Sequence, residues 1–557
     1  MFELPRGRIS GKTLSTLVTL IRKSPLKHAT AHVLRGDLGI TALASLGADA
    51  RGELPASLAP HVARNDHARA SAELGIPTVG EHPRTIDACA RALGAGRMHS
   101  EDLVRRSIDH ARALARRSPS LGPILDFDEE GALAAARAAD ARRSQGKALG
   151  PLDGVPMAIK EEIDVRGLPT RVGTGFLSRT PAREDSLPVR RLREGGAVII
   201  GSTPMTEYGM SPLGGNVHRV MPRNAHSEGH LPGGSSSGSG VAVATGVVPV
   251  ALGADGGGSI RIPAAYNGVF GIKPTYGRVP VVGHGVPGGS SVVHLGPLGA
   301  SAHDLAVFLE LTSGGDARDP VSLAQPRVDR GEWIGAIGRG VRGLRIGVDE
   351  DEWSAASAEV QKAGRAALTA LEREGAVLVP VGIRMARHAA PIGYLTIGLE
   401  FSANLREVRK AHMDELGLDL QMLFLNLETF LPDDYIDAQR LRSELRREIA
   451  ALLADVDLLA LPTTATTAPP VNDADLTHGF VDPVALDGAC RFAFIGNLTG
   501  CPAGTAPVGF DASGLPIGVQ FVGDAWDEAC VLQALAHLER VGVAEVKKPS
   551  AALDLFA

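Results

Sequence analysis

A glycine- and serine-rich stretch from Pro232 to Arg278 constrains this chain more than any other part of its sequence. It contains Pro-Gly-Gly-Ser-Ser-Ser-Gly-Ser-Gly at 232–240, then an apolar segment at 241–252, then Asp-Gly-Gly-Gly-Ser-Ile-Arg-Ile-Pro at 255–263. The apolar segment is long enough for a buried helix or strand. Glycine allows close backbone approach, so N–H groups can converge on one point. Serines among such groups indicate a nucleophile beside an anion pocket.

Composition limits the classes of protein that fit. The chain has 557 residues, 44% of them hydrophobic, so a large core is expected. A net charge of -6, from 57 basic and 63 acidic residues, argues against a nucleic-acid binder. No apolar run is long enough for a signal peptide or a membrane span, which predicts a cytoplasmic protein. Four scattered cysteines without a CxxC pair predict reduced, mostly buried thiols.

Periodicity divides the chain into three parts. Residues 1–80 predict a helical extension, with helices over 13–22 and 25–35 and a linker near 75–82. Its role is either docking or dimerisation, or simple packing as a leader. Residues 81–545 alternate helical and strand patterns, which predicts one α/β domain with a mixed, mostly parallel sheet covered by helices on both faces. Residues 546–557 form a C-terminal tail.

One lysine lies in an unusual setting. Gly-Val-Pro-Met-Ala-Ile-Lys at 154–160 alternates apolar residues up to Lys160, as in a strand. A charge on an apolar strand is costly to bury without a partner. Lys160 is therefore either a lysine that reaches solvent at a strand end or a functional group.

Three kinds of active or binding site use clusters of glycine and serine. Gly234–Gly238 matches the G-x-S-x-G pattern of Ser-His-Asp hydrolases around Ser236, but a loop with Pro232 precedes it where a strand should. Neither cluster has the Gly-Lys-Ser/Thr of a phosphate-binding loop. The third chemistry is a nucleophilic serine with a lysine base and a relay serine, which needs a desolvated lysine and a glycine-built oxyanion hole.

These residues resemble the amidase signature family over roughly Thr85–Arg540. The resemblance is most specific at 233–238, 255–263 and 271–277, and it includes the lysine strand at 154–160 and Gly-Leu-Pro-Ile-Gly-Val-Gln at 514–520. It implies the amidase signature fold, with no cofactor and no metal. The histidines at 218, 226 and 230 are too poorly spaced for a metal site.

The resemblance also implies a role for each matching residue. Ser259 would attack the carbonyl and form an acyl-enzyme, and Lys160 would take its proton through Ser235. The peptide between Gly234 and Ser235 would be cis. Backbone N–H groups of residues 256–259, that is Gly256, Gly257, Gly258 and Ser259, would form the oxyanion hole. Supporting roles fall to Ser236, Asp255 and Arg261, each of which could equally be a structural polar residue.

The sequence departs from the family at a few positions. Glu161 and Glu162 follow the lysine, where many members have one aspartate directly after it. Gly256 stands where the family usually carries Thr, Ser or Ile, which would loosen the oxyanion hole or enlarge the pocket. Ser237 replaces a usual glycine. No departure removes a catalytic group.

Three hypotheses follow for the function. The leading one is an amidase that hydrolyses the C–N bond of linear amides without peptide specificity. Its expected partners are a small-molecule amide, no nucleic acid, no membrane and a possible homodimer. The second is the A subunit of a tRNA-dependent amidotransferase, disfavoured by the long leader and Gly256. The third is a non-catalytic scaffold of the same fold, disfavoured by the intact lysine and serines.

Overall fold

A computed structural model describes residues 7–23, 26–47, 50–55, 59–62, 84–177, 179–285, 290–329, 331–554 and 556. Within these residues, an 11-stranded sheet runs through the molecule. In spatial order its strands are β2 (Asp126–Phe127), β4 (Val198–Thr203), β3 (Pro156–Lys160), β5 (Val250–Asp255), β7 (His294–Gly299), β6 (Phe270–Lys273), β12 (Ala503–Phe510), β13 (Pro516–Gly523), β10 (Leu458–Pro462), β8 (Arg345–Val348) and β9 (Val377–Pro380).

The sheet has two parallel sections, with antiparallel pairing between them and at its β2 edge. Strands β4, β3 and β5 are parallel neighbours, and so are β10, β8 and β9. Across the centre, each strand is antiparallel to the next in the spatial order β5, β7, β6, β12, β13 and β10. The expected α/β domain on one mixed sheet is confirmed, with its parallel pairing confined to these two sections.

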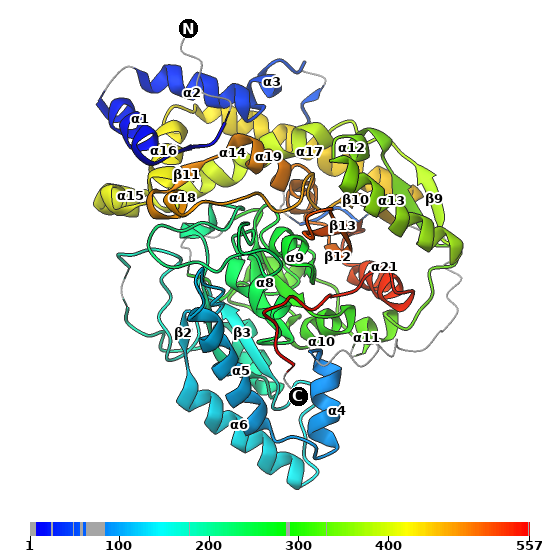
Figure 1. Cartoon of the computed structure of the whole chain (residues 1–557). Helices are drawn as coiled ribbons and strands as arrows, with labels where there is room; N and C mark the ends of the chain where they lie inside the picture. The colour runs from blue at the N-terminus through cyan, green and yellow to red at the C-terminus, as the bar shows by residue number, and fades with distance from the viewer. Residues whose placement is uncertain are drawn as a thin grey trace.

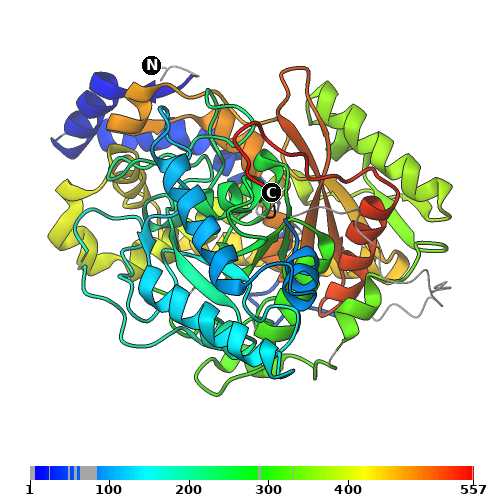
Figure 2. The same ribbon diagram turned by 60° about the horizontal axis from the view of Figure 1, so that its bottom comes forward.

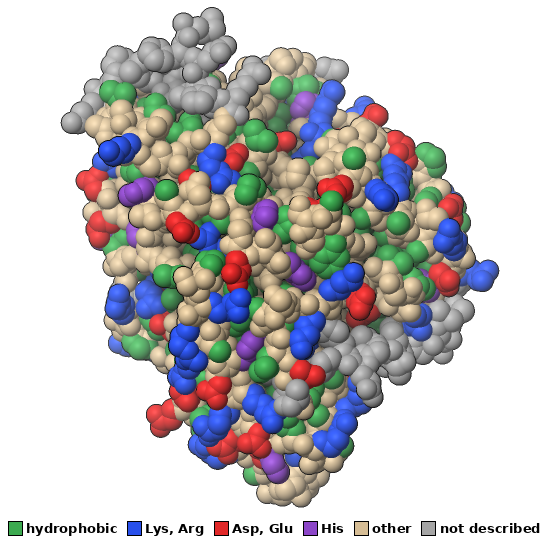
Figure 3. Space-filling model, viewed as in Figure 1, with side chains coloured by type: hydrophobic (Ala, Val, Ile, Leu, Met, Phe, Trp, Pro, Cys, Tyr) green, Lys and Arg blue, Asp and Glu red, His purple; other side chains and the backbone are tan. Residues whose placement is uncertain are grey.

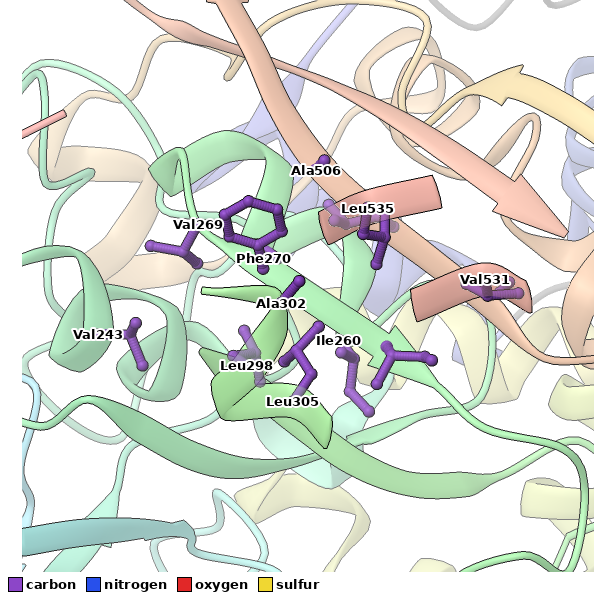
Figure 4. Packing of buried hydrophobic residues seen from close by; sticks show 14 of the residues in the cluster. Val243, Ile260, Val269, Phe270, Leu298, Ala302, Leu305, Ala506, Val531 and Leu535 are labelled. Carbon is purple, nitrogen blue, oxygen red and sulfur yellow. The ribbon is translucent and has the colours of Figure 1, made fainter. Parts of the chain in front are cut away.

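Helices cover both faces of the sheet, as expected. Adjacent strand positions point to opposite faces. On β13, a Cβ at Gly518 would meet Ala265 of α9, whereas a Cβ at Gly523 would meet Val531 of α21. The close-up in Figure 4 follows this packing, with Phe270 and Leu298 among the apolar side chains and Val531 and Leu535 on α21. Strands β3, β4 and β5 are buried along their whole length, which matches their continuous apolar sequence.

The helices have the following bounds. In the first half they are α4 (Ile86–Gly94), α5 (Ser100–Ala115), α6 (Glu129–Ser144), α7 (Leu187–Glu194), α8 (Ser237–Ala244), α9 (Arg261–Asn267), α10 (Ala302–Thr312), α11 (Glu332–Ala336), α12 (Glu350–Ser354) and α13 (Ala358–Arg373). In the second half they are α14 (Ala386–Asn404), α15 (Arg406–His412), α16 (Leu418–Leu427), α17 (Pro432–Asp455), α18 (Asp473–His478), α19 (Pro483–Cys490), α20 (Phe494–Thr499) and α21 (Glu528–Arg540).

The N-terminal extension packs against the second-half helices. It contains α1 (Gly11–Lys23), α2 (Leu26–Asp37) and α3 (Ile40–Ala44), so the helices expected over 13–22 and 25–35 are present. Leu14, Val18 and Ile21 of α1 form an apolar cluster with Met422 and Leu425 of α16. A two-stranded sheet of β1 (Ile9–Ser10) and β11 (Phe480–Val481) joins the extension to the body. Figures 1 and 2 show the three helices together at one corner of the molecule.

Only some of the residues at the predicted domain boundaries are described by the structure. The linker expected near 75–82, and with it the division after residue 80, lies outside the described residues. The C-terminal tail lies on the body, because Val546 and Ala552 are buried. Among the described residues, no helix combines the length and apolarity required to cross a membrane. On the face drawn in Figure 3, basic and acidic side chains are interspersed.

Candidate active site

Lys160 and the nucleophile loop lie at the same edge of the sheet. Lys160 is the last residue of β3, and the loop 256–260 follows β5, the parallel neighbour of β3. The carboxyl ends of parallel strands lie at one edge, so the order of the strands brings the two segments together. The Lys160 side chain is 1% exposed, so it does not reach solvent at the strand end.

The two serines lie on either side of α8 and β5. Ser235 precedes α8, and Ser259 lies between β5 and α9, so the apolar segment 241–252 is a helix followed by a strand. Lys160 Nζ donates a hydrogen bond to Ser235 Oγ at 2.7 Å. The N–H of Ser236 donates to the carbonyl of Ser259 at 3.3 Å. The peptide between Gly234 and Ser235 is cis, as the resemblance implies. Lysine, relay serine and nucleophile loop are therefore adjacent.

Asp255 and Arg261 form a buried ion pair beside the loop that carries Ser259. Arg261 donates from Nε to Asp255 Oδ2 at 3.0 Å and from Nη2 to Oδ1 at 3.1 Å, and both side chains are fully buried. Asn497 on α20 donates to Asp255 Oδ1 at 2.9 Å, and Gln520 on β13 accepts from Arg261 Nη1 at 2.8 Å. Burial alone would raise the pKa of Asp255, but Arg261 and these hydrogen bonds hold it well below its usual range. Asp255 is therefore a buried anion that organises the loop.

One expected oxyanion donor is already engaged. Gly258 donates its N–H to Asp255 Oδ1 at 2.6 Å, and Ile260 donates its N–H to Oδ2 at 3.2 Å. In this structure the Gly258 N–H therefore stabilises the loop, which differs from its expected role. Gly256, Gly257 and Ser259 are the remaining donors of the hypothesis. Ser236 has a supporting position, because its Oγ donates to the carbonyl of Ala254 on β5 at 3.2 Å.

The space beside Gly256 is filled. A Cβ at this position would lie 2.8 Å from Ile397 Cδ1 and 3.2 Å from Val293 Cγ2. These two side chains occupy the volume that a larger residue at 256 would take. The glycine therefore does not enlarge the pocket, contrary to one of the two expectations from the sequence.

An apolar cavity of about 210 Å³ opens at Ser259. Its walls include Phe430 and residues of α14, α16 and α19. The extension contributes Arg35, Leu38 and Ile40 to the same cavity. The roles that the sequence suggested for the extension, docking, dimerisation or packing, do not include this contribution to the cavity. The contact depends on packing between segments that are far apart in the chain.

Two polar residues near Lys160 were not anticipated. Glu162 Oε1 lies 2.6 Å from Lys160 Nζ, and Glu162 Oε2 lies 3.3 Å from His284 Nε2. Burial alone would raise the pKa of Glu162, but Lys160 and His284 lower it to about 2. The surroundings of Lys160 are therefore not simply apolar. The only sequence signal was the acidic pair after the lysine.

The loop histidines lie apart and make separate contacts. His218 Nε2 lies 2.8 Å from Glu207 Oε1, His226 Nε2 is 3.2 Å from the carbonyl of Asn267, and His230 Nδ1 is 2.8 Å from Ser227 Oγ. Among the described residues, no group of three or more His, Cys, Asp or Glu side chains could hold a metal ion. All four cysteines are unbridged and buried.

Comparison with known proteins decides the family. A family model described as Amidase matches residues 102–532. The chain belongs to the amidase signature family. Among solved amidases, the native peptide amidase from Stenotrophomonas maltophilia is 28% identical, with a TM-score of 0.72 over 85% of this chain and 99% of that one. A structure titled as a vestigial complex that reveals the origins of an s-triazine catabolic enzyme is 30% identical, with a TM-score of 0.76 over 83% and 100%. Hydrolysis of C–N bonds is the activity of this family.

Curated relatives carry a more specific name. The A subunit of the glutamyl-tRNA(Gln) amidotransferase of Chloroflexus aurantiacus is 34% identical over 84% of this chain and 98% of its own length. The protein of the same name from Azoarcus sp. is 36% identical over 81% and 96%. These names contradict two of the expectations about partners, which were a small-molecule amide and no nucleic acid. The relatives are subunits of an enzyme named for a transfer RNA, so these expectations were wrong. The net charge of the chain had led to the expectation of no nucleic acid, but one subunit of such an enzyme need not bind the nucleic acid itself.

Proposed function

We propose that this chain hydrolyses a carboxamide C–N bond through an acyl-enzyme on Ser259. The observation that supports the proposal most directly is the 2.7 Å hydrogen bond between Lys160 Nζ and Ser235 Oγ, because it joins a buried amine to a hydroxyl next to the nucleophile loop. A neutral amine at that position can accept the proton of Ser235 while Ser235 accepts the proton of Ser259.

The reaction then proceeds in two halves. Ser259 Oγ attacks the amide carbonyl, and its proton passes through Ser235 to Lys160. Backbone N–H groups of Gly256, Gly257 and Ser259 stabilise the oxyanion, and the loss of one such donor typically costs about 3 kcal/mol of transition-state stabilisation. The proton returns along the same path to the leaving nitrogen. Water then attacks the ester, and Lys160 with Ser235 again serves as the base.

The curated relatives favour one setting for this chemistry. In the A subunit of a glutamyl-tRNA(Gln) amidotransferase, ammonia released at Ser259 from a donor amide would be transferred to the glutamyl group on the tRNA, which another subunit would hold. The filled space beside Gly256 weakens one of the two sequence arguments against this setting. The apolar cavity lined by Arg35, Leu38 and Ile40 belongs to this chain and would receive the donor amide.

The catalytic proposal is tested on Ser259 itself. The wild-type chain is incubated with a fluorophosphonate probe and the modified peptide is identified by mass spectrometry. We expect an adduct on Ser259, none in Ser259→Ala, and a rate at least about 10³-fold lower in Lys160→Met, because the serine loses its base. Ser313→Ala, at the C-terminal end of α10 and outside the residues of the proposed mechanism, is a control. An intact, folded chain without an adduct at Ser259 favours the non-catalytic scaffold.

The proposal that this chain works as an amidotransferase subunit needs a separate test. The tagged chain is purified from its native host, and the purified assembly is assayed for conversion of Glu-tRNA(Gln) to Gln-tRNA(Gln). We expect conversion with glutamine or with ammonium in the wild type, and with ammonium alone in an assembly carrying Ser259→Ala. If the chain labels on Ser259 but its purified form converts no Glu-tRNA(Gln) with either nitrogen source, the amidotransferase setting is wrong and the hydrolase proposal stands.

A further inference from the structure

A buried carboxylate contacts the amine of Lys160 in addition to Ser235. Glu162 Oε1 lies 2.6 Å from Lys160 Nζ, and the two side chains are 5% and 1% exposed. The amine therefore has Ser235 Oγ and Glu162 Oε1 as close polar partners, with the carbonyl of Ala254 further away at 3.4 Å. An ion pair this deeply buried holds its partners firmly, because separation would leave an uncompensated charge.

The second oxygen of the same carboxylate contacts an imidazole. His284 Nε2 lies 3.3 Å from Glu162 Oε2. The backbone fixes this contact: Ile163 pairs with His284 in an isolated bridge, and Gly285 donates its N–H to the carbonyl of Glu162 at 2.6 Å. His284 also lines a cavity of about 820 Å³, and its side chain is 10% exposed. The carboxylate thus lies between an enclosed amine and an imidazole at a cavity wall.

The other charged groups around this cluster have partners of their own. Glu161 is turned toward Arg171 and Arg219. Asp164 accepts a hydrogen bond from Thr170. Beyond the two serines, Asp255 is paired with Arg261. The ionisable groups that line the cavity with His284 are Tyr276, His294, Asp319, Glu400 and Tyr435. Lys160 and His284 are the two neighbours that lower the pKa of Glu162.

We propose that Glu162 and His284 are positioning residues that set the pH at which Lys160 becomes a base. The proposal rests on the proposed function, because it gives Lys160 the role of proton acceptor. The anion of Glu162 stabilises the ammonium form, so Lys160 must lose a proton before it can accept one from Ser235. His284 interacts with the other oxygen of that carboxylate and so weakens its hold on the ammonium.

The two residues therefore act in opposite directions. An opposite charge within about 4–6 Å favours the charged form of a group by 1–3 pH units. Glu162→Gln removes the anion, so the base form should appear at lower pH. His284→Gln removes the competing imidazole, so the ammonium should persist to higher pH. A purely structural role would change the rate or the stability without this pair of opposite shifts.

The experiment measures the rate of fluorophosphonate labelling of Ser259 from pH 5 to pH 10 in the full chain. This readout needs no knowledge of the donor amide. We expect the rate to rise with pH in the wild type, with a midpoint about 1 unit lower in Glu162→Gln and about 0.5 unit higher in His284→Gln. His412→Gln is the matched control. His412 is a partly exposed histidine at the end of α15, and its Nδ1 lies 2.7 Å from Glu415 Oε1. The profile of this variant should superimpose on the wild type.

Two further variants keep the test decisive if the buried lysine destabilises Glu162→Gln. Glu162→Asp retains the charge and should keep the midpoint near the wild-type value with a slower rate, and His284→Asn should shift it as His284→Gln does. Equal midpoints in wild type and all variants would overturn the inference and leave the proposed function intact. No adduct on wild-type Ser259 at any pH would overturn both.

Discussion

Two buried carboxylates lie near Ser235 and Ser259, and the structure holds them in different ways. Asp255 is clamped by two nitrogens of the Arg261 guanidinium, Nε and Nη2, with Asn497 as a further donor. Glu162 lies between Lys160 and His284. Burial opposes ionisation of both carboxylates, and in both the neighbouring partners lower the pKa.

The difference lies in the partners. A guanidinium stays protonated at every pH a protein survives, so the clamp on Asp255 does not change with pH. The partners of Glu162 are instead an amine and an imidazole, each of which contacts one oxygen of the carboxylate. The loop after β5 is therefore held by one bidentate partner, whereas Glu162 is shared between two partners, and we propose that only the second arrangement responds to pH. The predictions below test this contrast.

The largest effect is expected from Asp255→Ala. The variant leaves Arg261 as a buried cation without its partner and removes the acceptor of the Gly258 N–H. Loss of one partner of a buried ion pair typically costs about 3–5 kcal/mol of folding free energy. Urea denaturation should reveal the loss, and labelling of Ser259 should fall at every pH without a shift of its midpoint.

The outcome separates the two carboxylates. Glu162→Gln should move the midpoint of labelling, whereas Asp255→Ala should not. A midpoint that moves in Asp255→Ala as far as in Glu162→Gln would mean that both carboxylates act on the base, and the contrast would be wrong. Glu407→Ala, which removes an exposed partner of Lys410, serves as the stability control.

A second prediction compares adjacent glycines of the loop. A Cβ at Gly257 would lie 2.5 Å from Cζ of Phe494, a ring packed against Tyr394. A Cβ at Gly256 would meet the terminal methyl of Ile397, which can rotate away. Gly257→Ala should therefore displace a donor of the oxyanion hole and slow labelling by about 10²-fold or more, whereas Gly256→Ala should slow it by about tenfold or less.

The double variant Gly256→Ala/Ile397→Val provides the check. Removal of the Ile397 Cδ1 methyl makes room for the new Cβ, so labelling should recover toward the wild-type rate. Equal losses in the two single glycine variants would show that the loop yields as a whole, and the bidentate support described above would not hold it in place.

The sequence indicated the candidate site residues, whose catalytic roles stay a prediction, but not the residues around them. Lys160, Ser235 and Ser259 belong to motifs with known spacing, and each motif marks a strand end or a helix start that the local pattern also indicates. The partners of these motifs were not predictable. His284 is far from Glu162 along the chain, and their contact depends on a turn and an isolated bridge rather than on a pattern.

Other misses have similar physical causes. Asn497 and Gln520 were visible as polar residues in glycine-rich segments, but only the antiparallel centre of the sheet brings them to Arg261. Strand β7 was not predicted, because its sequence His-Leu-Gly-Pro-Leu-Gly carries the glycines and proline of a loop. The helices of the extension were predicted, but their contact with the cavity at Ser259 was not.

The smallest effect is expected at a third buried carboxylate, Asp304 on α10. Asp304 Oδ1 accepts the N–H of Ile86 at 2.8 Å, and among the described residues no lysine or arginine forms an ion pair with this carboxylate. Burial raises its pKa to about 8. Glu539, which accepts the N–H of Ala302, has a pKa raised by burial to about 8 as well.

A raised pKa in the folded state means that the fold binds a proton that the unfolded chain releases near pH 4. This contribution to stability is complete below about pH 4 and is lost as pH rises toward 8. Asp304→Asn cannot titrate, so its melting temperature should fall by a few degrees less than that of the wild type between pH 5 and pH 8.5. The difference between variant and wild type cancels the titration of other groups, such as Lys273, whose pKa burial lowers to about 7. If the melting temperatures of wild type and Asp304→Asn changed in parallel with pH, an unpaired buried carboxylate would tolerate its charge. The partners beside Asp255 and Glu162 would then not be needed to keep those carboxylates ionised.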